Sequence, residues 1–192
     1  MIYFTFIGNH DKITSGQPFG AALTIFLQYK SLMDQVYIFV NPSKPNDDIN
    51  YTEIAQNNKS VMEQETPDLK VVIIELELHN PIDYDLVYPA MLHEVQNIME
   101  DETIEKAEKI INITSGTPTM TACWVLLHKS GLIPNSKIVQ SFETKFARIE
   151  YINNDCFNLS YMRHTEQWWE IYTDLSIDEC LKAIREEPHF LP

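Results

Sequence analysis

The sequence predicts an α/β protein with a doubly wound, mainly parallel sheet, followed by a C-terminal β-hairpin and a short helical tail. Short apolar runs rich in β-branched and aromatic residues alternate with stretches of helical periodicity up to about residue 142. Runs that are apolar throughout, such as Met1–Ile7, are typical of parallel strands buried on both faces. From about residue 147 two short alternating segments flank Asn153–Asp155, which is the pattern of a hairpin. Together these observations indicate a Rossmann-like architecture.

Five strands are predicted, each an apolar run that a polar turn ends: Met1–Ile7, Val36–Val40, Leu69–Leu78, Ala107–Ile111 and Lys137–Phe142. Of the helices between them, the first begins at Pro18, the second spans about residues 46–62 and the fourth begins at Pro118. The third follows Asp83, and Pro89 fits that helix only if it falls in the first turn. The common strand order 3-2-1-4-5 makes strands one and four neighbours where the order reverses.

The C-terminal part is predicted to hold a hairpin and a short helix. The two strands of the hairpin are Arg148–Ile152 and Phe157–Tyr161. Ser176 and Glu179 have the spacing of a capping box, which begins a short helix that Pro188 ends.

The length and composition favour one globular domain with an appendage. At 192 residues and 44% hydrophobic content a full core is expected. We place the domain at residues 1–162 and a helical tail or linker at residues 163–192. The formal net charge of −14 excludes a general surface for long nucleic acids or anionic membranes. Three cysteines without CxxC spacing indicate a reducing compartment, and no run has membrane-spanning length, so a cytoplasmic protein is expected.

The motifs of several cofactor-dependent classes are absent from the sequence. No GxGxxG follows the first strand and no GxxxxGK[ST] occurs, so we expect neither a dinucleotide cofactor nor a P-loop. His10-Asp11 and His93-Glu94 are isolated pairs without a further ligand at metal spacing. No cofactor and no metal site are therefore expected.

The turn after the fourth strand, Asn112-Ile-Thr-Ser-Gly-Thr-Pro-Thr-Met120, is the strongest candidate site. Pro118 suits the first turn of a helix, so Thr114–Thr117 lie where a strand ends and a helix begins. Main-chain N–H groups are unpaired there and the helix dipole is positive, which makes the turn a ready anion site. Gly116 lets a ligand approach the main chain, and the hydroxyls of the turn can orient it. The same pattern also fits a capped turn that binds nothing.

A second polar loop, Gly8-Asn-His-Asp-Lys12, follows the first strand. In a doubly wound sheet, ligands bind beyond the carboxyl ends of the strands, where the strand order reverses. With strands one and four adjacent, the two polar loops meet at that place. Gln17 near the head of the first helix, and Asp83 and Tyr84 after the third strand, can line the same crevice.

The turn Asn112–Met120, together with Gly8-Asn-His-Asp11, resembles the CARF domain (CRISPR-associated Rossmann fold) of type III CRISPR ancillary proteins. The resemblance covers about residues 1–160 in layout, and only the strand-four motif is specific. It implies a homodimer that binds cyclic tetra- or hexa-adenylate across its two-fold axis in antiviral defence. It also implies allosteric control of an attached effector domain, for which the chain up to Pro192 has no room.

The resemblance also implies which residues contact the ligand. Phosphates and riboses would be cradled by the strand-four turn, namely Thr114, Ser115, Gly116, Thr117, Pro118 and Met120. The adenines would be bordered by the strand-one loop and the first helix, namely Asn9, His10, Asp11 and Gln17 with Gly8 beside them, and flanked by Asp83 and Tyr84. Because a side chain at Gly116 would block the close approach of a ligand to an exposed turn, Gly116→Val is expected to weaken ligand binding far more than it destabilises the fold.

Two alternatives to a non-catalytic sensor stay open. The first is a ring nuclease, in which a ribose 2′-hydroxyl attacks the neighbouring phosphate and the developing charge needs a donor. His10 and Lys12 are the candidates for that donor. The second alternative is an unrelated Rossmann-like protein that binds a mononucleotide or a partner protein.

Overall fold

The chain forms two compact units, Met1–Ser141 and Phe142–Pro192. The computed structural model describes residues 1–15, 19–43, 48–141, 147–153, 156–162 and 168–186. The division after Ser141 groups the hairpin with the C-terminal unit, whereas the domain expected from the sequence extended to residue 162. Each unit is a separate fold with a core of its own.

The N-terminal unit is built on a parallel five-stranded sheet in the order β3-β2-β1-β4-β5. Its strands are β1 Ile2–Phe6, β2 Gln35–Val40, β3 Lys70–Glu75, β4 Lys109–Asn112 and β5 Ser136–Val139. The predicted doubly wound fold and the strand order 3-2-1-4-5 are therefore confirmed. The third strand ends at Glu75, so the last three residues of the predicted run belong to the loop that follows.

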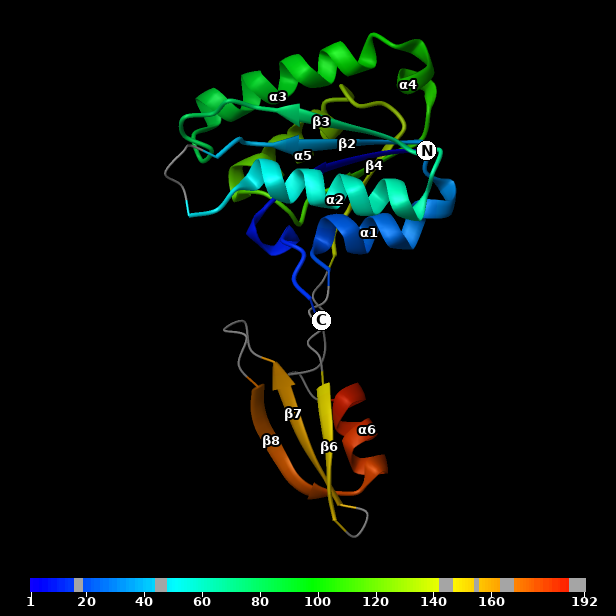
Figure 1. Cartoon of the computed structure of the whole chain (residues 1–192), viewed down its shortest axis with the longest axis vertical. Coiled ribbons are helices and arrows are strands. Elements are labelled where there is room, and N and C mark those ends of the chain that lie inside the picture. Colours follow the sequence, from blue (N-terminus) through cyan, green and yellow to red (C-terminus); the bar gives the residue numbers. More distant parts are fainter. Residues whose placement is uncertain (16–18, 44–47, 142–146, 154–155, 163–167, 187–192) are drawn as a thin grey trace. The chain divides into compact units, whose positions relative to one another are not determined.

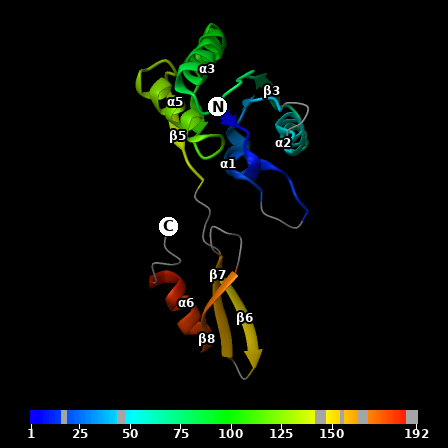
Figure 2. The same ribbon diagram turned by 90° about the vertical axis from the view of Figure 1, so that its left-hand side faces the viewer.

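Helices cover both faces of this sheet (Figures 1 and 2). Successive residues of a strand point to opposite faces, so β1 contributes Phe4 and Phe6 to one core and Tyr3 to the other. The first core is closed by α3 Tyr84–Met99, α4 Glu102–Lys106 and α5 Pro118–Lys129. The second core is closed by α1 Ala21–Tyr29 and α2 Tyr51–Glu65.

Trp124 of α5 is the centre of the first core. Its side chain is fully buried, and its ring centroid lies 5.8 Å from that of Phe4, 5.9 Å from Phe6 and 5.0 Å from Phe39. Aromatic pairs at these separations add specific ring contacts to the burial of apolar area. This packing holds α5 against β1 and β2.

Two helix predictions need correction. The first helix begins at Ala21 with Gly20 as its N-cap, and Pro18 lies outside the described residues. Pro89 is the sixth residue of α3 and lies inside the helix, past the first turn. Proline cannot donate to the carbonyl four residues earlier, but the buried face that includes Val87 and Met91 holds the helix together.

The C-terminal unit is an antiparallel three-stranded sheet in the order β6-β7-β8 with one helix. The predicted hairpin is present as β6 Ala147–Asn153 and β7 Cys156–Met162. The strand β8 Trp168–Leu175 was not predicted, and it leads into α6 Ile177–Glu186. Ser176 and Glu179 form the predicted capping box, with the Glu179 N–H donating to Ser176 Oγ at 3.3 Å and the Ser176 N–H donating to Glu179 Oε2 at 2.9 Å.

No helix among the described residues combines the length and the apolar character that crossing a membrane requires.

Candidate functional site

The loops that follow β1 and β4 touch each other at the carboxyl edge of the sheet. The Ser115 hydroxyl donates to Asp11 Oδ1 at 3.2 Å, across 104 positions of sequence. The main chains are equally close, because a Cβ atom built on Gly8 would lie 3.1 Å from the nitrogen of Gly116. The sequence placed these loops together by the strand order alone, and the structure joins them by direct contact.

The Asp11 carboxyl accepts hydrogen bonds from the strand-one loop, from the start of α1 and from the strand-four turn. Its Oδ2 accepts from the Gly8 N–H at 2.8 Å and its Oδ1 from the Ala22 N–H in the first turn of α1 at 2.9 Å, besides the bond from Ser115. The side chain is only 2% exposed. Burial raises the pKa of the carboxyl, and the donors from Ala22, Gly8 and Ser115 work against that rise. Asp11 therefore positions the two loops rather than facing solvent.

Asn112 holds the strand-four turn in place through hydrogen bonds from the end of β4. The residue is fully buried at the end of β4. Its amide donates to Thr5 Oγ1 at 3.0 Å and to Ser115 Oγ at 3.3 Å, and its oxygen accepts from the Thr114 N–H at 2.8 Å. A buried polar group that is bonded in this way sets the path of the chain around it.

The hydroxyls of the turn bond to the protein itself, although the sequence led us to expect them to orient a ligand. Thr114 Oγ1 accepts from the Ser141 N–H at 2.7 Å, and Thr117 Oγ1 donates to the Pro81 carbonyl at 2.9 Å. Among the described residues, the N–H groups of Ser115 and Gly116 have no hydrogen-bond acceptor. Free donors at this turn are thus main-chain groups, at the start of the twelve-residue helix α5.

The fold itself requires glycine at position 116, whereas the sequence suggested only that a ligand needs the space. Its φ is +97°, a conformation that side chains rarely adopt, and an added Cβ would lie 3.0 Å from Phe6 Cβ. The Met120 sulfur is 3.2 Å from the same position, and Met120 is 97% buried. Any side chain at Gly116 therefore strains the fold as well as blocking the approach of a ligand, so the expectation for Gly116→Val needs this correction. Pro118 is at the first position of α5, as predicted, and is exposed.

The loop between β3 and α3 is attached to the same helix start. Thr117 donates to the Pro81 carbonyl and Thr119 Oγ1 donates to the Ile82 carbonyl at 2.9 Å. Asp83 caps α3 by accepting from the Asp85 N–H at 2.9 Å, and Tyr84 at the first position of that helix is 52% exposed. The structure thus brings Asp83 and Tyr84 to the edge that holds the two polar loops.

Three further predicted residues, Asn9, His10 and Lys12, lie on the strand-one loop. Asn9 and His10 belong to a 3₁₀ turn, Asn9–Asp11, and their side chains are exposed, as is that of Lys12. Gln17 lies outside the described residues. The side chain of Asn9 has a partner that the sequence did not suggest, because the Tyr51 hydroxyl donates to Asn9 Oδ1. The sequence did hold one indication of this contact, because Tyr51 begins the helix that follows strand two and so lies at the same edge of the sheet as Asn9.

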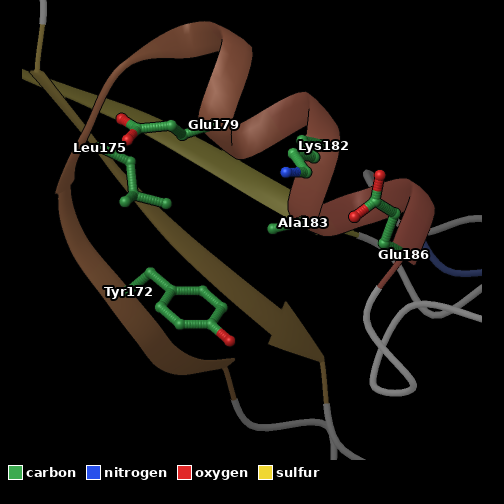
Figure 3. Close-up of a pocket in the computed structure, with 6 residues that line it drawn as sticks. All are labelled: Tyr172, Leu175, Glu179, Lys182, Ala183 and Glu186. Carbon is green, nitrogen blue, oxygen red and sulfur yellow. The ribbon is translucent and has the colours of Figure 1, made fainter.

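Two hollows among the described residues lie away from the candidate site. One, of about 300 Å³, lies between β8 and α6 of the C-terminal unit and is lined by Tyr172, Leu175, Glu179, Lys182, Ala183 and Glu186 (Figure 3). The other, of about 590 Å³, lies at the amino ends of β4 and β5, where Tyr29 and Lys109 are among its lining residues.

The described residues hold no cluster of three or more histidine, cysteine or acidic side chains that could bind a metal ion.

Comparison with known sequences gives two partial matches. A family model described as a domain of unknown function, DUF3024, matches residues 126–192. The transcriptional regulatory protein RtcR of Escherichia coli strain K12 is 40% identical over 76 residues, which are 40% of this chain and 14% of RtcR. The chain therefore corresponds to a small part of that regulator.

Comparison with solved structures shows the fold. Csm6 of Enterococcus italicus, bound to cyclic hexa-2′-fluoro-hexa-dAMP, matches with a TM-score of 0.59 at 18% identity, over 74% of this chain and 33% of Csm6. Can2 of Sulfobacillus thermosulfidooxidans, in complex with cyclic tetra-adenylate, matches with a TM-score of 0.44 at 12% identity, over 91% of this chain and 38% of Can2. The likeness to Csm6, at 18% identity, shows that this chain has a similar fold over 74% of its length.

Proposed function

We propose that the N-terminal unit binds a cyclic oligoadenylate as a homodimer and controls an effector through that binding. The observation that carries the proposal is the junction of the strand-one and strand-four loops through Asp11 and Ser115. Support comes from the N–H groups of Ser115 and Gly116, which have no acceptor among the described residues, and from the exposure of Gly116 and Asn9, one on each of the joined loops.

The physical basis is local rather than a matter of overall charge. Main-chain N–H groups at a helix N-terminus, with the positive end of the helix dipole, hold an anion without a basic protein surface. A formal net charge of −14 is compatible with such a site. Two copies related by a two-fold axis would present the α5 start twice, which matches a cyclic ligand with repeated phosphates.

The comparisons support the proposal at the level of fold. Csm6, whose fold this chain shares over 74% of its length, was solved with a cyclic adenylate analogue. The match to a transcriptional regulatory protein fits a sensor unit whose output is set by other domains. A change in the orientation of two subunits around a bound ring would be the signal that an effector reads.

Calorimetric titration with cyclic tetra-adenylate and cyclic hexa-adenylate tests the proposal. Linear tetra-adenylate with a terminal phosphate is the control for the tetra-adenylate ring, since it has the same four bases and four phosphates without the ring. We expect one of the rings to bind with a micromolar or lower Kd and the linear form to bind at least tenfold more weakly. The absence of heat with both rings at micromolar protein, with the fold intact by circular dichroism, would contradict the proposal.

A second candidate function is cleavage of the bound ring, which the exposure of His10 and Lys12 on the strand-one loop favours. In that reaction a ribose 2′-hydroxyl loses its proton to water and its oxygen bonds to the adjacent phosphorus. The bond to the 5′-oxygen breaks, a donor protonates that leaving oxygen, and the products are a 2′,3′-cyclic phosphate and a 5′-hydroxyl. Incubation of the ring with the protein, followed by chromatography, would show linear products that His10→Ala or Lys12→Ala abolishes. Intact ring after prolonged incubation would exclude this activity.

A further inference from the structure

Helix α2 contacts the strand-one loop at two points on one of its faces. Tyr51, the first residue of the helix, donates its hydroxyl to Asn9 Oδ1. Asn58, seven residues and thus two turns later, donates its Nδ2 to the Asp11 carbonyl at 2.8 Å. The 3₁₀ turn Asn9–Asp11 is therefore held at both ends by the same helix.

Hydrogen bonds at the start of α2 fix the main chain of Tyr51, independently of its contact with Asn9. Its N–H donates to Ser43 Oγ at 2.7 Å, and that hydroxyl in turn donates to the Ile49 carbonyl at 2.5 Å. Asn50 caps the helix by accepting from the Glu53 N–H at 3.0 Å. A phenol on a main chain anchored in this way presents its hydroxyl in a defined direction.

The contact decides which end of the Asn9 amide faces outward. An asparagine amide has one oxygen that accepts and one NH₂ group that donates two hydrogen bonds. The Tyr51 hydroxyl occupies the oxygen, while no described residue accepts from the NH₂ group of the exposed Asn9. Asn9 is thus presented to its surroundings as a donor.

We infer that Tyr51 is a positioning residue, which orients Asn9 to donate to an acceptor atom of the bound ring. This inference rests on the proposed function. The acceptor is a phosphate oxygen or a ring nitrogen of adenine, since both accept a hydrogen bond from an NH₂ group. Asn9 follows Gly8 directly, and a Cβ on Gly8 would lie 3.1 Å from the nitrogen of Gly116, so the Asn9 NH₂ group adds a donor on the loop that meets the strand-four turn.

The test measures the Kd of cyclic tetra- or hexa-adenylate, whichever the wild type binds, for Tyr51→Phe, Asn9→Ala and the double variant. Tyr51→Phe retains the ring and removes only the hydroxyl, and Tyr29→Phe at the opposite end of the sheet is the matched control. We expect Tyr51→Phe to weaken binding about threefold to tenfold and Asn9→Ala about tenfold. The double variant should bind like Asn9→Ala, because Tyr51 acts only through Asn9.

The outcomes separate this inference from the proposed function. If the wild type binds the ring and Tyr51→Phe binds equally well, the inference alone is wrong. It is also wrong if the loss caused by Tyr51→Phe persists in the Asn9→Ala background, since Tyr51 would then act by shaping the fold. A wild type that binds no ring overturns both.

Cyclic tetra-uridylate distinguishes the two sources of the acceptor. This ring retains the phosphates and lacks adenine. An equal loss for Tyr51→Phe with both rings assigns the Asn9 donor to a phosphate oxygen, and a loss confined to the adenylate ring assigns it to the base.

Discussion

Replacement of Asp11 by alanine is expected to lower the free energy of unfolding of the N-terminal unit by about 2–4 kcal/mol. The carboxylate accepts from the Gly8 N–H, the Ala22 N–H and the Ser115 hydroxyl, at 2.8, 2.9 and 3.2 Å. Hydrogen bonds to a charged group contribute roughly 1.5–3 kcal/mol each, and the variant leaves two main-chain donors without an acceptor. The cost of burying the carboxylate, which also raises its pKa, offsets part of that sum.

Urea unfolding measures this effect if one tryptophan reports on the N-terminal unit. The protein has three tryptophans, so replacing Trp168 and Trp169 by phenylalanine leaves the buried Trp124 as the single reporter. Asp68→Ala, which removes an exposed carboxylate from the turn before β3, is the matched control and should stay within about 0.5 kcal/mol of the parent. A loss below about 1 kcal/mol for Asp11→Ala would refute the role of Asp11 as the junction of the loops.

The same carboxyl predicts a pH dependence of stability. Its pKa is raised in the folded protein above the ordinary value of 3.8, so between these two values the folded state binds more protons than the unfolded state. The contribution of Asp11 to stability is therefore greatest below pH 3.8 and falls as the pH rises through the folded pKa. The difference in unfolding free energy between the parent and Asp11→Asn should shrink over that window. If this difference in unfolding free energy grew with pH instead, the hydrogen-bond donors to Asp11 would lower its pKa by more than burial raises it.

Two glycines give the remaining predictions. Gly20→Ala places a Cβ 2.2 Å from the His10 carbonyl oxygen and should cost about 2 kcal/mol or more, measured as a lower urea midpoint. Gly116→Ala combines a φ of +97° with contact to Phe6 and should lower the melting temperature by several degrees. Gly131→Ala, with a φ of +77° and no atom within 4 Å of the added methyl, is the control for strain without overlap. Equal effects at Gly116 and Gly131 would mean that the contact to Phe6 contributes nothing.

The layout of the fold could be predicted because it follows from local patterns and from a general rule of topology. Apolar runs identified the strands of the parallel sheet, and the strand order made the loops at Gly8 and Gly116 neighbours. The N-terminal start of α5 at Pro118 was likewise visible, since proline at a first helical position is a local signal.

The use of the polar side chains could not be predicted, because their partners are far apart in the sequence. The Ser115 hydroxyl finds Asp11 across 104 positions and Tyr51 finds Asn9 across 42. No local spacing distinguishes a hydroxyl that turns inward to such a partner from one that faces a ligand. The sequence predicted both the unpaired main-chain N–H groups and the hydroxyls of the turn as ligand donors, whereas in the structure the hydroxyls of Thr114 and Thr117 bond to the protein and the free donors among the described residues are main-chain groups.

The strand β8 and the position of Pro89 within α3 were not predicted, because pairing and packing with distant residues decide both. β8 pairs with β7 through two irregularities, one between Phe157 and Leu159 and one between Leu159 and Ser160. Such irregularities interrupt the alternation by which a strand is found in a sequence. The prediction allowed Pro89 only in the first turn of α3. It lies past that turn because the packing of the buried face of α3 outweighs the local cost of a proline inside a helix.

The ratio of ring to protein in a calorimetric titration tests the central claim most directly. The account holds that two loops of each chain, joined by Asp11 and Ser115, form half of a cradle that a second copy completes. It predicts saturation at one cyclic oligoadenylate for every two chains. Saturation at one ring per chain, by a protein that sediments as a monomer before and after the addition, would contradict it.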